Sequence, residues 1–257
     1  MSEIQQVAVI GAGIMGSGIA HTFAQHGFNV TLMDVDDARL TIGLHTLRAN
    51  LERQVKKGTL TGPDAEAALT RITTTTALAE AGSAHVIIEA APEQLDLKLQ
   101  ILRELDQLSA HAILASNTSS ISITVLAGQC AHPERVIGMH FMNPVPVMKL
   151  VEVIRGLQTS DETTDAVMAL THRLGKTPVE VNDSPGFVSN RVLMPLINEA
   201  IFCVMEGVAL PEAVDTVMKL GMNHPLGPLA LADLIGLDTC LAIMEVLQRD
   251  LGEDKHR

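Results

Sequence analysis

The feature that most constrains this 257-residue sequence is a glycine-rich run, GAGIMG at residues 11–16, directly after a short apolar segment. Residues 6–10 read QVAVI, which is typical of a buried β-strand. Residues 15–26 then follow a helical pattern, and Gly27 is placed to end it. A strand, a glycine turn and a helix in this order predict the start of a βαβ unit, and hence a parallel sheet.

Apolar strand-like segments keep alternating with helical patterns up to about residue 182. We expect long helices over residues 38–57 and 93–108. Further strands are predicted over residues 28–34, 85–89, 112–116, 135–140, 151–154 and 179–182. Residues 1–182 are therefore predicted to form an α/β domain of the Rossmann type, with a mainly parallel sheet.

The pattern changes near Asp183, and no strand is predicted after it. Ser184 is interpreted as a helix N-cap and Pro185 as the first helical residue. Helices are expected over residues 186–206, 211–220, 228–235 and 237–251. Residues 183–257 are therefore predicted to form a smaller, all-helical C-terminal domain.

The residues of the glycine run suit the pyrophosphate of a dinucleotide. Gly11 permits the tight turn, Gly13 has no Cβ to block a phosphate, and Gly16 lets the helix pack on the strand. Ile14 and Met15 begin the helix, whose unpaired N–H groups and positive dipole end attract an anion. The run therefore predicts a dinucleotide-binding site.

Asp34 closes the next predicted strand, eighteen residues after Gly16. A carboxylate at this place can accept hydrogen bonds from ribose hydroxyls and would repel a 2′-phosphate, so NAD is favoured over NADP. The alternative is a glycine turn that binds no ligand and an aspartate that only meets water.

Composition argues against several other classes of protein. The 30 acidic and 18 basic residues give a formal charge of -12, which disfavours a nucleic-acid partner. We find no N-terminal signal pattern and no apolar stretch suited to a bilayer span, so a cytoplasmic protein without membrane contact is expected. The three cysteines form no CxxC pair and the histidines no metal-ligand pattern, so no metal is expected.

Three later segments together resemble one enzyme family. They are SNTSS at residues 116–120, HFMNPVPVMKLVEVI at residues 140–154 and DSPGFVSNR at residues 183–191. From the first strand to about Asp238, the sequence closely resembles the 3-hydroxyacyl-CoA dehydrogenases, including the short-chain 3-hydroxybutyryl-CoA enzymes. The resemblance implies NAD-dependent oxidation of a short 3-hydroxyacyl-CoA to the 3-ketoacyl-CoA, and the reverse reaction.

The resemblance also implies four residues that act on the substrate. His140 matches the general base, Glu152 the carboxylate that orients it, and Ser119 and Asn190 the residues that hold the substrate. The chemistry agrees, because oxidising a secondary alcohol needs a base for the hydroxyl proton, and a carboxylate can fix the histidine tautomer. His140 ends one predicted strand and Glu152 lies in the next, so the two side chains can face each other.

Further positions are carried over from the same resemblance. It implies that Glu93, Lys98 and Asn143 contact the cofactor, and that Lys57 and Asn50 meet the nucleotide of CoA.

Assembly is predicted from the helical module. Family members pair through it, and the long helix expected over residues 186–206 carries more apolar surface than one contact stripe needs. A homodimer through the C-terminal helices is therefore expected. The family's last segment, which ends in a GFY-like run, has no counterpart before Arg257, so the helical domain is expected to lack it.

Each assignment has a simpler alternative. Taken alone, His140 could be a structural histidine and Glu152 a surface acid. Ser119 could only cap a helix, Asn190 could bridge helices, and Lys57 could belong to a solvated lysine pair. Two rival functions also remain: a dehydrogenase for a free hydroxy acid, and a non-enzymatic NAD-binding or structural protein on the same fold.

Overall fold

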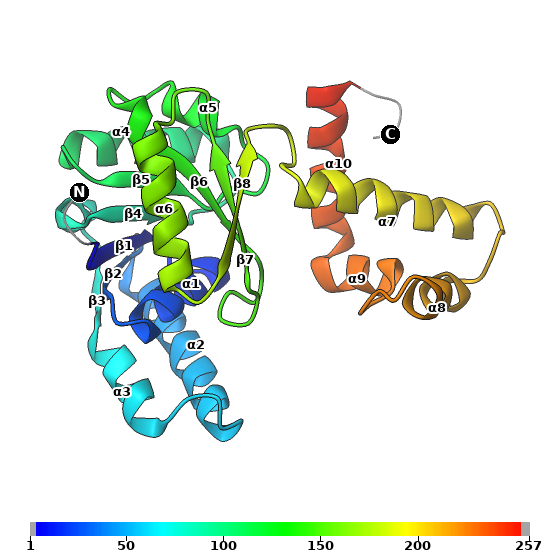
Figure 1. Cartoon of the computed structure of the whole chain (residues 1–257), viewed down its shortest axis with the longest axis horizontal. Coiled ribbons are helices and arrows are strands. Elements are labelled where there is room, and N and C mark those ends of the chain that lie inside the picture. The colour runs from blue at the N-terminus through cyan, green and yellow to red at the C-terminus, as the bar shows by residue number, and fades with distance from the viewer. Residues whose placement is uncertain (1–3, 253–257) are drawn as a thin grey trace. The chain divides into compact units, whose positions relative to one another are not determined.

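The computed structural model describes residues 4–252, and the chain divides into two compact units, Met1–Asp183 and Ser184–Arg257. The first unit contains an eight-stranded sheet in the order β3-β2-β1-β4-β5-β6-β7-β8 (Figure 1). All neighbouring strands pair in parallel except β6 and β7, which pair antiparallel. The strands are β1 (Gln6–Ile10), β2 (Asn29–Met33), β3 (Ile72–Thr75), β4 (Val86–Glu89), β5 (Ile113–Ser116), β6 (Val136–Phe141), β7 (Leu150–Arg155) and β8 (Thr177–Asn182). The predicted α/β class with a mainly parallel sheet is confirmed.

Helices cover both faces of this sheet. They are α1 (Ile14–Gln25), α2 (Asp37–Lys56), α3 (Gly62–Thr70), α4 (Leu95–Leu108), α5 (Ile123–Ala127) and α6 (Asp161–Arg173), with two 3₁₀ segments, η1 (Leu78–Ser83) and η2 (Pro133–Arg135). Phe23 of α1 and Val167 of α6 share one core with Val9 and Met139 of the sheet. Helices α4 and α5 contact β4, β5 and β6. Because side chains alternate along a strand, His140 points to the face opposite Met139.

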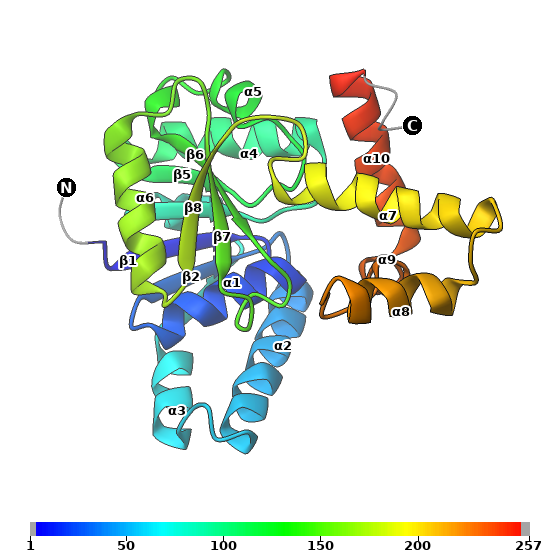
Figure 2. The same ribbon diagram turned by 45° about the vertical axis from the view of Figure 1, so that its right-hand side comes forward.

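Three elements of the first unit have a weak sequence signal. Strand β3 reads ITTT and lies at the edge of the sheet, so only one of its residues is apolar. Helix α6 turns Thr163, Thr164 and Thr171 into the interior, where the hydropathy pattern predicts apolar residues. Helix α3 is short and packs against α1 and α2 just before β3 (Figure 2). Burial of threonine on a helix depends on local hydrogen bonds that hydropathy does not register.

The second unit is helical, with a small core. Its helices are α7 (Ser189–Met205), α8 (Pro211–Gly221), α9 (Pro228–Ile235) and α10 (Leu237–Leu251). The buried side chains that form its core are Met194, Ile197, Ala232, Cys240 and Leu247. Among residues 4–252, none of the helices combines the length and apolar character that crossing a bilayer requires.

The predicted start of the long helix is wrong. Gly186 and Phe187 have φ angles of 73° and 50°, which the right-handed helix does not allow. The N–H of Phe187 instead donates to the carbonyl of Ser184 at 2.9 Å, closing a turn, and α7 begins at Ser189. Ser184 is therefore a turn residue and not the N-cap.

Candidate active site

The glycine turn between β1 and α1 leaves an open space where a ligand can approach. A Cβ added to Gly11 would lie 2.6 Å from the carbonyl oxygen of Ala90, and one added to Gly16 would lie 1.7 Å from the oxygen of Gly11. A Cβ at Gly13 would meet nothing within 4 Å. Gly11 and Gly16 are thus required by packing of the protein itself, whereas Gly13 faces the open side of the turn.

The start of α1 suits an anion at this open side. Gly13 is the N-cap, and no side chain caps the helix. Ile14 and Met15 follow it, so their N–H groups and the positive dipole end of α1 point to the space above Gly13. The turn therefore fits a pyrophosphate.

Asp34 lies beside the same turn, directly after β2. Its Oδ2 accepts the N–H of Ala12 and its Oδ1 accepts the N–H of Val35, both at 2.7 Å. Each oxygen keeps further acceptor capacity, which ribose hydroxyls can use. The carboxylate thus supports the glycine turn and also gives it a negative charge that disfavours a 2′-phosphate.

The structure brings His140 and Glu152 directly opposite each other on β6 and β7. The Nδ1 of His140 lies 2.8 Å from Oε2 of Glu152, and both side chains are buried. A carboxylate only accepts, so Nδ1 carries the proton and donates it to Glu152. In the neutral ring Nε2 is then the acceptor, and the carboxylate fixes this tautomer.

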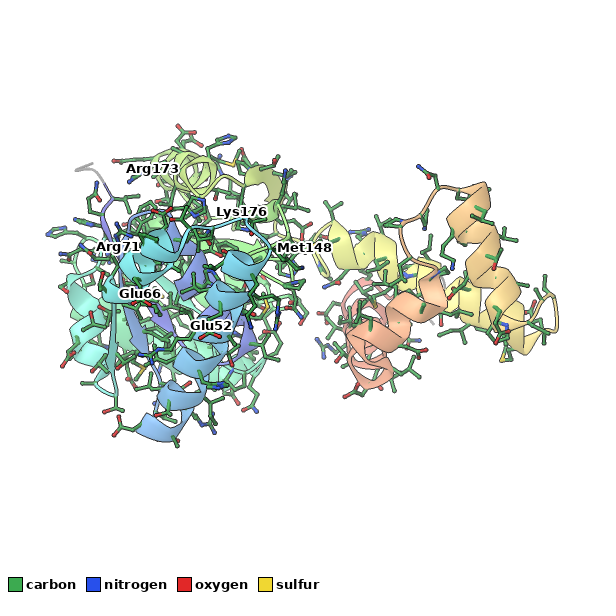
Figure 3. The ribbon with its side chains drawn as sticks, turned by 90° about the horizontal axis from the view of Figure 1, so that it is seen from below. Glu52, Glu66, Arg71, Met148, Arg173 and Lys176 are labelled. Atoms are coloured by element: carbon green, nitrogen blue, oxygen red, sulfur yellow. The ribbon has the colours of Figure 1, made fainter. Side chains whose placement is uncertain are left out.

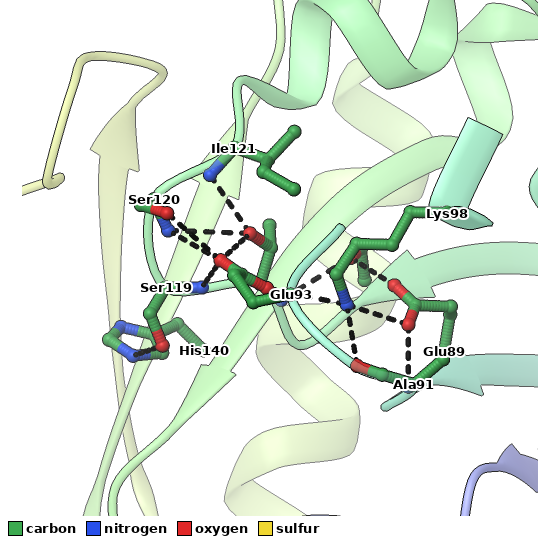
Figure 4. Close-up of polar contacts among 10 residues, drawn as sticks. Glu89, Ala91, Glu93, Lys98, Ser119, Ser120, Ile121 and His140 are labelled. Carbon is green, nitrogen blue, oxygen red and sulfur yellow. Dashed lines mark hydrogen bonds and ion pairs between the residues drawn. The ribbon is translucent and has the colours of Figure 1, made fainter. Parts of the chain in front are cut away.

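Ser119 meets the other nitrogen of the same ring. It follows β5, and its Oγ lies 3.1 Å from Nε2 of His140 (Figure 4). With Nε2 as acceptor, the hydroxyl of Ser119 donates to it. Three neighbouring strands thus place Ser119, His140 and Glu152 in one hydrogen-bonded line.

Glu93 organises the main chain around Ser119. Its Oε1 accepts the hydroxyl of Thr118 at 2.6 Å, the N–H of Ser119 at 2.9 Å, and both the N–H and the hydroxyl of Ser120 at 3.0 Å. Burial raises the pKa of Glu93, but the Lys98 ammonium and these hydrogen bonds outweigh it and hold the pKa below its usual value. Glu93 is therefore a carboxylate at neutral pH.

Sequence reasoning assigns no role to several polar residues of this region, although some of them lie within the segments at residues 116–120 and 183–191. Glu89 and Ser116 end the buried strands VIIE and ILAS, and Oδ1 of Asn117 accepts the N–H of Phe141 at 3.0 Å. Asp183 accepts the hydroxyl of Ser122 at 2.6 Å. The available signal is a polar residue at the end of a fully apolar strand, because such a residue lies at the ligand-binding edge of a parallel sheet.

The remaining predicted residues lie on other elements of the chain. Asn143 is exposed after β6, and Asn190 lies in α7 of the second unit. Asn50 on α2 accepts from Arg53 at 3.3 Å, and Lys57 is exposed at the C-cap of α2. Both belong to the hairpin of α2 and α3.

Two cavities of the first unit are lined by residues other than those around His140. One, of about 700 Å³, lies between α2 and α3, where Glu52 and Glu66 line it, and a smaller one is lined by Met148 and Lys176 (Figure 3). Neither is lined by His140. The polar contacts around His140 therefore define the candidate site.

The Rossmann-type turn, Asp34 and the buried histidine–glutamate pair define a nucleotide-dependent dehydrogenase. Residues 6–184 match the model of the 3-hydroxyacyl-CoA dehydrogenase NAD binding domain, and residues 186–257 match that of the family's C-terminal domain. The chain belongs to the 3-hydroxyacyl-CoA dehydrogenase family of NAD-dependent oxidoreductases.

Individual relatives of this family align with the chain over most of their own length. The chain is 59% identical to a probable 3-hydroxybutyryl-CoA dehydrogenase of Bacillus subtilis, over 99% of this chain and 89% of the relative. It is 50% identical to a 3-hydroxybutyryl-CoA dehydrogenase of Bradyrhizobium diazoefficiens, over 99% and 87%. The crystal structure of (S)-3-hydroxybutyryl-CoA dehydrogenase from Ralstonia eutropha superimposes with a TM-score of 0.96 at 52% identity, covering 99% of this chain and 90% of that one.

Proposed function

We propose that the protein oxidises (S)-3-hydroxyacyl-CoA to 3-ketoacyl-CoA with NAD, and catalyses the reverse, on short acyl chains such as 3-hydroxybutyryl. The observation that carries this proposal is the line of Ser119, His140 and Glu152 on the same sheet as the dinucleotide turn. The short chain length is supported by the names of relatives at 50% and 59% identity.

His140 is the general base of the oxidation. Its Nε2 takes the proton of the C3 hydroxyl while hydride leaves C3, and Glu152 stabilises the imidazolium that forms. In the reverse direction the imidazolium returns this proton to the oxygen of the ketone. Burial of Glu152 keeps its charge close to the ring and shielded from water.

Ser119 and Asn190 hold the substrate. The Ser119 hydroxyl, already within reach of Nε2, can donate to the C3 oxygen and so keep this oxygen at the base. The amide of Asn190 is suited to the C3 oxygen or the thioester carbonyl. In reduction the same donors polarise the ketone.

The residues that hold the cofactor come from the first unit. NAD, when bound, supplies the acceptor for the hydride. Gly13 and the start of α1 take its pyrophosphate and Asp34 its ribose, while Glu93 and Asn143 are assigned to the nicotinamide portion. Lys98, which was also expected there, is buried 3.4 Å from Oε2 of Glu93 and serves this portion through Glu93. Lys57 and Asn50, on the hairpin of α2 and α3, are assigned to the nucleotide of CoA.

The two domains divide these tasks. Residues 1–182 bind NAD and carry the base, while residues 183–257 provide Asn190 and the surface through which two chains pair. The small core of the helical unit, with many exposed apolar side chains, supports this pairing.

The experiment that tests the function follows NADH oxidation with acetoacetyl-CoA, longer 3-ketoacyl-CoAs and free acetoacetate. We expect turnover with acetoacetyl-CoA, and a loss of about 10²-fold or more in kcat for His140→Gln while NADH still binds. His132→Gln is the matched control, because His132 pairs with Glu134 at 3.3 Å but is exposed. Equal turnover of free acetoacetate would instead support a hydroxy-acid dehydrogenase, and NADH binding without turnover would support a non-enzymatic protein.

A further inference from the structure

A buried carboxylate that the proposed mechanism does not use lies beneath the Ser119 loop. Glu89 ends β4 and its side chain has no exposed surface. Its Oε1 accepts the N–H of Ala91 at 2.6 Å and the ammonium of Lys98 at 2.7 Å, and its Oε2 accepts the hydroxyl of Ser116 at 2.6 Å. A buried carboxylate with three short hydrogen bonds is held in one geometry.

One chain of contacts leads from Glu89 to Ser119 through Lys98 (Figure 4). The Nζ of Lys98 also donates to the carbonyl of Ala91 at 3.0 Å and lies 3.4 Å from Oε2 of Glu93. Its three N–H groups therefore have three acceptors. Glu93, held in this way, accepts the N–H of Ser119 with its other oxygen. Lys98 thus acts on the site through Glu93.

A second chain leads from Glu89 through Ser116. The Oγ of Ser116 accepts the N–H of Thr118 at 3.3 Å, and the hydroxyl of Thr118 donates to Glu93 at 2.6 Å. The main chain before and at Ser119 is therefore connected to Glu89 by two routes.

We infer that Glu89 is a positioning residue for the reaction: by holding Lys98 and Ser116 it fixes the main chain at Ser119, so that the Ser119 hydroxyl stays within reach of His140. The inference rests on the proposed function, because it takes Ser119 and His140 as the groups that meet the substrate. An amide at position 89 leaves Lys98 with Glu93 as its one carboxylate partner among the residues that the structure describes. Glu93 is then drawn toward Lys98 and away from the N–H groups of the loop, and small displacements of reacting groups lower the rate steeply.

The test is a double-mutant cycle in the full-length enzyme. The kcat for NADH-dependent reduction of acetoacetyl-CoA is measured for Glu89→Gln alone and in a Ser119→Ala background. We expect a loss of about tenfold or more from Glu89→Gln alone, and less than about twofold when Ser119 is already alanine, because the two changes share one effect. A general structural role would lower kcat by the same factor in both backgrounds.

Asp106→Asn is the matched control. Asp106 is also a buried carboxylate of the first unit, whose oxygens accept from Arg135 at 2.7 Å and from the N–H of Ala131 at 2.6 Å. It lies toward the other end of α4 from Lys98. We expect Asp106→Asn to lower the midpoint of thermal unfolding but to leave kcat within about twofold in both backgrounds.

Three results would overturn the inference. They are an equal loss of kcat in the two backgrounds, an unchanged kcat in folded Glu89→Gln, and a loss of the same size in Asp106→Asn. If Glu89→Gln does not fold, Ser116→Ala replaces it, since it keeps the ion pair and removes only one hydroxyl. We then expect Ser116→Ala to lower kcat about threefold, and to lower it no further in the Ser119→Ala background. An unchanged kcat in Ser116→Ala alone would also overturn the inference.

Failure of the proposed function has a different signature. In that case the wild-type protein does not oxidise NADH with acetoacetyl-CoA, or Ser119→Ala keeps the full rate. If only the Glu89 inference fails, the wild-type protein still oxidises NADH with acetoacetyl-CoA, and Ser119→Ala still lowers the rate.

Discussion

We propose that Asp34 decides between the two nicotinamide dinucleotides. Its charge is the feature that disfavours a 2′-phosphate, and it is held beside the turn by two N–H donors. We expect Asp34→Asn to lower the preference for NADH over NADPH by about tenfold, because the repulsion between the carboxylate and a 2′-phosphate is removed. The measurement is kcat/KM for each cofactor.

The control for this change is Asp36→Asn. Asp36 is exposed and caps α2 by accepting from the N–H of Arg39 at 2.8 Å, a task that asparagine also performs. The Asp36→Asn variant should therefore show the same preference for NADH over NADPH as the wild type. A preference that is unchanged in Asp34→Asn would contradict the role given to Asp34.

His21 gives the fold a pH dependence that is separate from catalysis. Burial lowers the pKa of His21 from 6.5 to about 4, against the opposing hydrogen bonds of Gln25 and Gln54. Since the folded pKa lies below the unfolded one, the unfolded chain binds more protons between these values. Stability is therefore full above pH 6.5 and falls toward pH 4, by about 3 kcal/mol.

Chemical denaturation between pH 7 and pH 4 measures this dependence. The wild type should lose about 3 kcal/mol of unfolding free energy as the pH falls, and His21→Gln should not, since glutamine does not titrate. The difference in unfolding free energy between the two proteins should therefore shrink by about 3 kcal/mol. His172→Gln, which changes an exposed histidine on α6, should follow the wild-type curve. A His21→Gln curve parallel to the wild type would exclude His21 as the source.

Residue patterns could predict part of the site and not the rest. The family resemblance implies the pair of His140 and Glu152, and the two consecutive predicted strands allow their side chains to face each other. Strands β6 and β7 place these residues directly opposite. The contact of Glu89 with Lys98 could not be predicted, because their geometry depends on how α4 packs against the end of β4. Hydropathy reports that a residue is buried, but a buried charge is identified only by its partner.

The ends of helices also divide into those that the sequence predicts and those that depend on tertiary packing. Helices α9 and α10 begin and end at the predicted residues because Pro228, Gly236 and Gly252 mark their limits. The start of α7 could not be predicted. Phe187 is buried and anchors a turn, and this turn gives it a positive φ. The Ser-Pro pair before an apolar run is typical of a helix start, and the tertiary packing overrides this pattern.

The element that joins β1 to α1 allows a sharp comparison of two glycines. We expect Gly13→Ala to fold normally but to weaken NADH binding about tenfold or more, because its Cβ enters only the open space above the turn. Gly16→Ala should instead destabilise the fold, since its Cβ would overlap the Gly11 carbonyl. Fluorescence titration with NADH and thermal unfolding separate the two effects. A destabilised Gly13→Ala with normal NADH affinity would reverse this assignment.

At the scale of the whole molecule, the helical unit leaves an unusual share of apolar surface uncovered. Among residues 4–252, twelve of the twenty-two exposed large hydrophobic residues belong to it, although it is the smaller of the two units. They include Val192 and Met205 on α7, Leu220 on α8 and Leu234 on α9. Since exposed apolar patches mark association surfaces, this distribution supports pairing through the helical unit.

Pairing is tested by placing a charge on that surface. Light scattering at micromolar concentration should give twice the 27.5 kDa chain mass for the wild type. Met205→Glu should shift the mass toward one chain, because a buried carboxylate without a partner opposes association. Leu157→Glu is the control, since Leu157 is 86% exposed in the first unit and should leave the dimer intact. A monomeric wild type with full activity would refute the proposed dimer, and dissociation by Leu157→Glu would move the interface to the first unit.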